Sequence, residues 1–212
     1  MSASDAPVRE PGTRARSGNA MARTRTALLE AAGECLARYG IRKTTMVDVA
    51  ARSKVAKATL YNHFRTKDDL LVAYVEERVA GLARTAVATA SAGGLTPALE
   101  EVATALADDP VLRRAASQEP ALLAPLAAPS QTRGWELARV GVADVLVASR
   151  VPSTPADVDL VLRWGVSQLL WPGAKDGSVD VLVRALGSAS LPAPEAPAAP
   201  PGPVPAVGWP RD

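Results

Sequence analysis

The 212-residue sequence predicts an all-α protein. Apolar residues recur at the helical spacing of three or four positions, as at Leu28, Ala32, Cys35 and Leu36. Several segments also begin with a hydroxyl or carboxyl cap residue that is followed by proline or by an acidic residue three positions later. No run with strand periodicity and hairpin punctuation interrupts them. We therefore expect eight or nine helices and no sheet.

The helix boundaries follow from these signals. Gly40 ends the first helix, and Thr45-x-x-Asp48 and Thr66-x-x-Asp69 form capping boxes for later ones. Three further starts place proline at the first helical position: Thr96-Pro97, Asp109-Pro110 and Thr154-Pro155. Pro120, Pro125 and Pro129 should kink or break the sixth helix. The predicted helices span residues 22–39, 45–52, 56–63, 67–90, 96–108, 110–126, 131–149, 156–171 and 178–187.

Charge and composition narrow the class of protein. Residues 1–70 carry 13 Lys and Arg against seven Asp and Glu, whereas residues 71–212 carry 11 against 15. A basic end suits binding to a polyanion. One cysteine and one histidine exclude an intramolecular disulfide and a soft metal site, so we expect no metal or other cofactor. The lack of a long apolar run and of a signal peptide favours a cytoplasmic protein that does not enter membranes.

The composition changes along the chain predict four segments. Residues 1–20 should be a flexible arm, since they are rich in Ser, Ala, Pro, Gly and Arg without periodicity. Residues 21–66 should form a three-helix unit, and residues 67–187 a larger helical domain. Residues 188–212 hold eight of the 18 prolines and should form a disordered tail.

The third predicted helix is short and carries polar side chains that suit the DNA major groove: Lys57, Thr59, Tyr61 and His63. Two preceding helices would support it, as in a helix-turn-helix unit. Lys57 can reach a guanine or a phosphate and Thr59 a base edge, whereas Tyr61 and His63 should reach phosphates. Tyr61 could instead belong to the core. His63 has no recognisable nucleophile or orienting partner, so we do not expect an enzyme.

Further phosphate contacts are expected at the flanks of this helix. Lys67 lies in the first turn of the next helix, beside exposed amide N–H groups. The N–H groups after Thr44 and Thr45 offer a similar anion site on the other side. These residues complete a set that would bind double-stranded DNA mostly through its backbone.

Residues 24–72 carry a family pattern. Its members are Tyr39-Gly40, Thr44-Thr45, Val49-Ala50, Val55, Thr59-Leu60-Tyr61, His63-Phe64, Lys67 and Leu70-Leu71. With this pattern the segment resembles the DNA-binding domain of the TetR family of bacterial transcriptional regulators. The chain departs from the family at Lys54, Ala56 and Ala58, where glycine, serine and glycine are usual. Lys54 could add a phosphate contact, and the changes bear on turn geometry and operator sequence.

The resemblance implies a helical ligand-binding and dimerisation domain after the helix-turn-helix unit. A homodimer would read a palindromic operator, acting as a repressor that a small molecule releases. The last two helices would form the dimer interface, with Leu160, Trp164, Trp171, Leu182 and Leu186 as candidate contacts. Because Ala, Val and Leu dominate the second half, we expect a small apolar ligand with Trp135 and Arg139 as contacts.

Other interpretations stay open from the sequence. A regulator of the same fold could lack a small-molecule ligand and answer to a protein partner, or act as an activator. A helical enzyme or small-molecule carrier could have an incidental basic end. The apolar helix at 156–171 could also be enclosed within a monomer.

Overall fold

The computed structural model describes residues 12–123, 132–170 and 177–188, and every regular element within those ranges is helical. The predicted all-α fold class is therefore confirmed. The elements are α1 (Gly12–Tyr39), α2 (Met46–Ser53), α3 (Lys57–His63), α4 (Lys67–Gly93), α5 (Leu95–Asp108), α6 (Pro110–Gln118), η1 (Pro120–Leu122), α7 (Arg133–Ala148), α8 (Pro155–Leu170) and α9 (Ser178–Ser188).

The observed boundaries differ from the predicted ones by one to three residues at many helix ends, and by more at the start of α1 and the end of α6. Helix α1 begins at Gly12, so residues 12–20 of the predicted arm are helical; the Ala and Arg residues there favour helix and no proline interrupts it. Helix α5 begins at Leu95, one residue before the predicted Thr96 cap, behind Gly94 with φ of 87°. The tail predicted for residues 188–212 lies outside the described residues beyond Ser188.

Side-chain caps fix the helix starts that the sequence marked. Thr45 and Thr66 each accept a hydrogen bond from the backbone N–H three residues on, and Asp48 and Asp69 each accept one from the N–H of the cap residue. Asp109 caps α6 ahead of Pro110. The predicted break also occurs, because α6 ends at Gln118 and only the short 3₁₀ turn η1 begins at Pro120.

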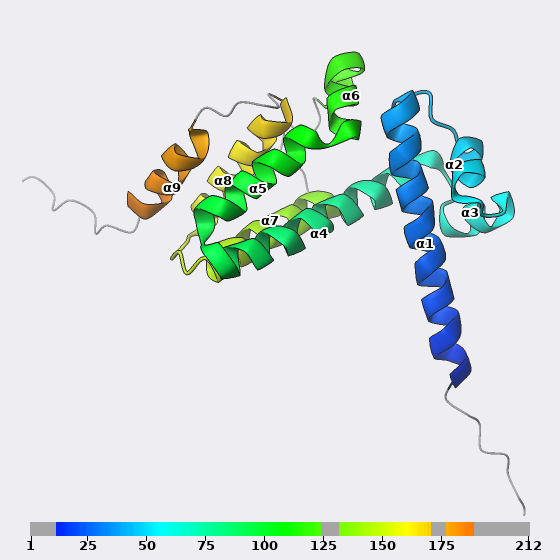
Figure 1. The fold of residues 1–212 in the computed structure, drawn as a ribbon, viewed down its shortest axis with the longest axis horizontal. Coiled ribbons are helices and arrows are strands. Elements are labelled where there is room, and N and C mark those ends of the chain that lie inside the picture. Colours follow the sequence, from blue (N-terminus) through cyan, green and yellow to red (C-terminus); the bar gives the residue numbers. More distant parts are fainter. Residues whose placement is uncertain (1–11, 124–131, 171–176, 189–212) are drawn as a thin grey trace, which may run out of the picture.

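Two hydrophobic cores share one helix. The first lies among α1, α2, α3 and the start of α4, with Leu28, Val49 and Leu60 fully buried. The second lies among α4, α5, α7, α8 and α9. Helix α4 contributes Leu70 and Ala73 to the first core, and Ala86 and Ala90 to the second. Figure 1 shows α4 running from the three N-terminal helices into the second group.

Helices α4 and α7 pack closely along their length, as Figure 1 shows. The closest approach is at Gly141 of α7, where an added Cβ would lie 2.6 Å from the Cβ of Ala83. Gly134, near the start of α7, lies beside Val75 in the same way, with 3.8 Å between an added Cβ and Cγ1. Glycine at position 141 therefore permits the spacing of the two helices.

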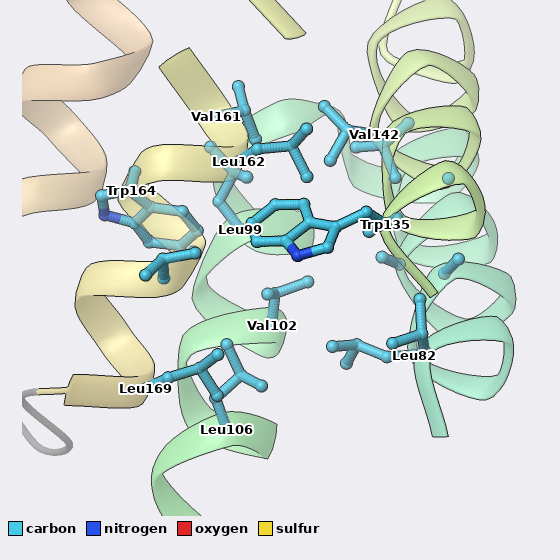
Figure 2. Close-up of a pocket in the computed structure, with 18 of the residues that line it drawn as sticks. Leu82, Leu99, Val102, Leu106, Trp135, Val142, Val161, Leu162, Trp164 and Leu169 are labelled. Carbon is cyan, nitrogen blue, oxygen red and sulfur yellow. The ribbon is translucent and has the colours of Figure 1, made fainter. Parts of the chain in front are cut away.

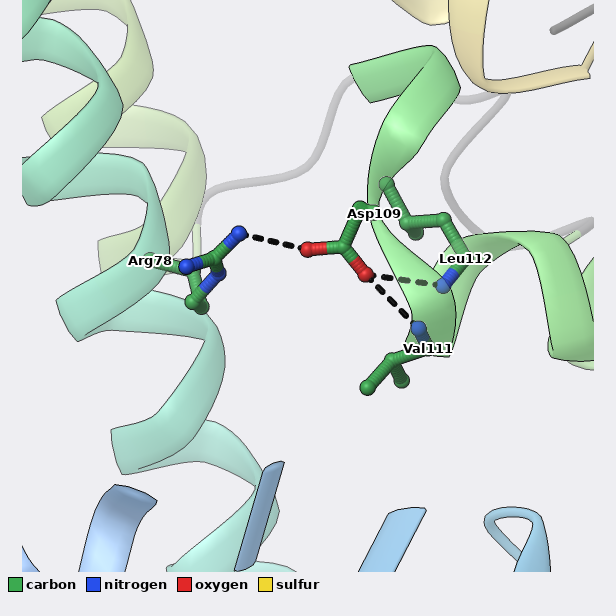
Figure 3. Close-up of polar contacts among 4 residues, drawn as sticks. All are labelled: Arg78, Asp109, Val111 and Leu112. Carbon is green, nitrogen blue, oxygen red and sulfur yellow. Dashed lines mark hydrogen bonds and ion pairs between the residues drawn. The ribbon is translucent and has the colours of Figure 1, made fainter. Parts of the chain in front are cut away.

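Helix α6 is fastened to α4 at its N-terminal end by a buried carboxylate. Asp109 accepts hydrogen bonds from the N–H groups of Val111 and Leu112, at 2.9 and 3.0 Å, and receives the Arg78 guanidinium at 2.6 Å (Figure 3). A carboxylate with three charge-assisted bonds is well satisfied despite its burial. Asp109 lies directly after α5, so this contact joins α4, α5 and α6.

The other end of α6 holds the turn between α1 and α2. The Glu119 carboxylate accepts hydrogen bonds from the N–H groups of Ile41 at 2.7 Å and Arg42 at 3.0 Å. Gly40 opens this turn with φ of 88°, and an added Cβ would meet Glu119 Oε2 at 3.2 Å and Arg114 Nε at 3.3 Å. Positive φ and the close carboxylate both require glycine here. We call the Glu119 contact with Ile41 and Arg42 the α6 clamp.

Replacing Gly141 with alanine should destabilise the protein. The new methyl would overlap Ala83, and overpacking costs about 1–3 kcal/mol, against a gain in helix propensity of up to about 1 kcal/mol. Urea unfolding should give a lower free energy of unfolding for Gly141→Ala. Gly165→Ala is the matched control, because nothing lies within 4 Å of its added Cβ. Equal stability of the two variants would contradict the tight α4–α7 packing.

Glu119→Gln should loosen the α6 clamp without changing side-chain shape. A neutral amide replaces a charged acceptor, and bonds to charged groups are worth about 1 kcal/mol more than neutral ones. Hydrogen exchange measured by NMR should then be several-fold faster at the Ile41 and Arg42 amides. Glu100→Gln, on the exposed side of α5, serves as the control. Unchanged protection at both amides would show that the clamp does not hold the turn.

Candidate functional site

Helix α3 is a short helix that presents one polar side to solvent. Leu60 is fully buried beneath it, and Phe64 at its C-cap is buried in the same core. On the outer side Lys57, Tyr61 and Asn62 are exposed. The Lys57 ammonium lies 6.0 Å from the centre of the Tyr61 ring, within cation–π range. These side chains form a cationic and aromatic surface that can meet a polyanion.

The remaining residues predicted on α3 are partly covered. Thr59 is half-buried, and the half-buried His63 ring lies 6.2 Å from the Phe64 ring. Tyr61 is 41% exposed, so it belongs to the surface and not to the core. The structure thus brings Lys57 and Tyr61 to the outer face and leaves Thr59 and His63 at its edge.

The turn before α3 has the unusual geometry that the sequence departures suggested. Lys54 is exposed and left-handed, with φ of 57° and ψ of 23°. Ala56 sits at the N-cap of α3 without a side-chain hydrogen bond. A non-glycine residue in this region and a missing cap each cost about 1 kcal/mol. The turn keeps the helix-turn-helix geometry in spite of these costs.

The two threonines predicted to lie at the DNA interface, Thr44 and Thr45, both form hydrogen bonds within the protein. Thr44 is only 3% exposed, and its hydroxyl and N–H both donate to the Gly40 carbonyl, at 2.8 and 3.1 Å. The Thr45 N–H donates to Asp48 at 2.9 Å. Hydrogen bonds from the Thr45 hydroxyl and then from its N–H lower the Asp48 pKa. Of the two N–H groups predicted to bind phosphate, after Thr44 and after Thr45, that of Thr45 already donates to Asp48 and that of Met46 stays a prediction, while the Thr44 side chain is buried in the turn.

Lys67 lies in the first turn of α4, as predicted. Its contact also identifies Arg42, which was not predicted as a site residue. Its Nζ donates to the Arg42 carbonyl at 3.0 Å, which brings the exposed Arg42 and Lys43 beside the start of α4. The adjacent basic residues Arg42 and Lys43, just before the Thr45 cap, could have indicated a phosphate-binding flank from the sequence. Asn62 was also missed, although it follows Tyr61 on the exposed side of α3.

An apolar cavity of about 360 Å³ lies in the second domain. Its walls are α4, α5, α7 and α8, and Val, Leu, Ala and Gly residues dominate them. Figure 2 shows the Trp135 indole reaching from α7 into the space between α5 and α8, with Leu99 and Val102 beside it. Trp164 lines the same cavity from α8. This volume falls in the lower part of the range for ligand pockets, about 300–1,000 Å³.

The two predicted ligand contacts have different positions. Trp135 lines the cavity, but Arg139 does not. The exposed Arg139 guanidinium instead pairs with Asp159 of α8 at 2.5 Å. The prediction for Arg139 is therefore corrected: although positions four apart share a helix face, its guanidinium extends outward to Asp159 and does not line the cavity.

The residues predicted to form the dimer interface differ in how far they are exposed. Leu160 is 41% exposed on α8, whereas Leu182 and Leu186 are buried in the second core of their own chain. Trp164 lines the cavity, and its Nε1 donates to the Ser178 hydroxyl at 3.1 Å. Leu182, Leu186 and Trp164 thus face inward, which corrects their assignment to an interface. Trp171 lies outside the described residues.

The described residues do not meet the requirements of a metal site, a membrane span or a reactive cysteine. The described residues contain no group of three or more His, Cys, Asp or Glu that could hold a metal ion. None of the described helices is long and apolar enough to span a membrane. Burial raises the pKa of the Cys35 thiol, so this side chain is an unreactive part of the first core.

Comparisons with known proteins agree with this arrangement. Residues 28–74 match the family described as bacterial regulatory proteins, tetR family. The TetR family repressor AlkX from Dietzia sp. strain DQ12-45-1b is 23% identical, with 76% of this chain and 97% of that chain covered at a TM-score of 0.58. A TetR transcription regulatory protein from Mycobacterium vanbaalenii is also 23% identical, with coverage of 79% and 96% and a TM-score of 0.48. No curated protein matches significantly.

The family match spans most of the first core, including α2, α3 and the start of α4. The second domain shares the helical fold of the Dietzia repressor. The exposed side of α3 lies within the matched residues: residues 28–74 are similar in sequence to the tetR family of bacterial regulatory proteins, and the chain is similar in fold to the Dietzia repressor.

Proposed function

We propose that this protein is a homodimeric repressor that binds a palindromic DNA operator and is released by a small apolar ligand. The observation that carries the proposal is the apolar cavity of about 360 Å³, one wall of which is α4. The first turns of α4 belong to the core beneath α3. A ligand in the cavity would therefore touch the helix that positions the DNA-binding unit.

The exposed cations around α3 would carry DNA binding. Lys57 and Tyr61 occupy its outer face, and Lys54 precedes it in the turn. Arg42 and Lys67 lie together on the flank. In this arrangement Lys57 contacts bases or phosphates in the major groove, and the flanking cations hold the backbone. Thr59 and His63 would contribute from the edge of the surface.

Release from the operator would require two conformations of the protein for which the ligand has different affinities. A ligand shifts an equilibrium only by its difference in affinity between states, and a near-complete switch needs roughly 5.5 kcal/mol. The cavity touches α4 directly and α5, which leads into Asp109 and α6. A displacement of these helices would reach the α1–α2 turn through the α6 clamp. Coupling through α4 and α6 thus supports a ligand-controlled regulator over a partner-controlled one.

Dimerisation would use the outer faces of α8 and α9. Leu160 of α8 and Val181 of α9 are exposed, at 41% and 60%. Large apolar side chains on the two helices suit a self-complementary patch around a two-fold axis. Two α3 helices related by that axis would read the two halves of a palindrome.

Lys57→Ala should weaken operator binding. If Lys57 reads a base, affinity for DNA from upstream of the protein's own gene falls by about 1–3 kcal/mol while binding to a scrambled duplex changes little. Fluorescence anisotropy over a salt series measures both. Arg84→Ala, which removes an exposed cation from α4 in the second domain, is the control. Unchanged affinity in Lys57→Ala would overturn its assignment, and equal loss on both duplexes would make it a phosphate contact.

Leu160→Glu should convert the dimer to a monomer. A carboxylate facing its symmetry mate adds like-charge repulsion and the cost of burying a charge. Light scattering should show half the mass, and operator affinity should fall with it. Val72→Glu adds the same charge at a 58% exposed site in the first turns of α4, between Leu70 and Ala73 of the first core, and it should stay dimeric. Dimeric Leu160→Glu would place the interface elsewhere.

A further inference from the structure

Among the described residues of the cavity wall, the polar groups are the Thr132 side chain and the indole N–H groups of two tryptophans. Of its two tryptophans, Trp164 already uses its indole N–H, which donates to Ser178. The Trp135 N–H has no hydrogen-bond partner among the described residues, and Figure 2 shows its ring within the cavity. An indole N–H is a donor that cannot accept, so it calls for an acceptor. Trp135 is half-buried, so its N–H stays accessible from the cavity.

Within the part of the chain that the structure describes, the cavity offers no charge that could hold an ionised ligand. No described side chain in its lining is charged. The nearby cations on α7 are already paired outside it: Arg139 with Asp159 at 2.5 Å and Arg133 with Glu76 at 3.8 Å. Moving a carboxylate or phosphate into such a site without a counter-charge costs several kcal/mol.

We infer that the ligand is a neutral, mainly hydrocarbon molecule with one hydrogen-bond acceptor, a carbonyl or ether oxygen, that binds the Trp135 Nε1–H. This inference rests on the proposed function and names the ligand class of the same cavity. At roughly 30 Å³ for each water-sized group, the volume of about 360 Å³ holds on the order of a dozen non-hydrogen atoms. The hydrocarbon part packs on the valines and leucines, and the oxygen fixes its orientation.

Three probes of similar size and different polarity test the inference. Valerophenone and n-pentylbenzene differ by a ketone in place of a methylene, and 4-phenylbutyrate carries a charge. In ¹⁵N-labelled protein, valerophenone should shift the Trp135 indole N–H signal downfield, whereas n-pentylbenzene should not. The signal is assigned by its absence in Trp135→Phe. Calorimetry should show much weaker binding of 4-phenylbutyrate than of the ketone.

The variants separate a hydrogen bond from simple packing. Trp135→Phe should reduce ketone affinity roughly three- to tenfold more than hydrocarbon affinity, the size of one neutral hydrogen bond. Trp164→Phe is the control, because its N–H is already bonded and it should affect both probes alike. Equal losses in Trp135→Phe, or an unshifted indole signal with bound ketone, would overturn the inference. If Trp135→Phe does not fold, the Trp135 signal is assigned by elimination from Trp164→Phe, Trp171→Phe and Trp209→Phe, and it still decides.

The failure of this inference is distinguishable from the failure of the proposed function. n-Pentylbenzene could bind while Trp135→Phe leaves ketone affinity unchanged. That result would rule out a hydrogen bond to Trp135 but would still support a ligand-binding cavity. Equal affinity for 4-phenylbutyrate would reject a neutral ligand. If neither neutral probe binds, the ligand-responsive function itself fails, and a partner-controlled regulator becomes the better explanation.

Discussion

The structure depends on a single helix that belongs to two hydrophobic cores. Leu70 and Ala73 of α4 are buried with the N-terminal helices, whereas Ala86 and Ala90 are buried with the C-terminal ones. The cavity wall formed by α4 lies largely between these two sets. Packed cores transmit displacement because their interiors resist compression. A tilt of α4 within the second core must therefore move its first turns, and with them the support of α3.

A second connection constrains how far α4 can move alone. Asp109 ties α6 to Arg78 in the middle of α4, and Glu119 ties the other end of α6 to the Ile41 and Arg42 amides. Both contacts use carboxylates, whose hydrogen bonds are shorter and stronger than neutral ones. The α1–α2 turn is thus held from α6 and, through Lys67 and the Arg42 carbonyl, from α4. The two helices must shift together or break one of these contacts.

Local signals in the sequence predicted the helices and the DNA-binding unit well, because caps act within three residues of each other. Thr45-x-x-Asp48 and Thr66-x-x-Asp69 start the helices that they marked. Predictions that depended on which side of a helix faces a distant element were weaker. Thr44 turns inward, Arg139 turns outward to Asp159, and Leu182 packs into its own domain. Glu119 lies 78 residues from Ile41, and no local pattern could have paired them.

The apolar cavity also bears on how a ligand would act in the proposed regulator. Removing the apolar lining from water stabilises the fold by roughly 25 cal/mol for each Å², whether a ligand covers the lining or the side chains collapse onto one another. Collapse is limited here, because the close contact of Gly141 with Ala83 already sets the α4–α7 distance. A ligand recovers that free energy without collapse. Only the part of the binding free energy that depends on the position of α4 can alter the position of α3.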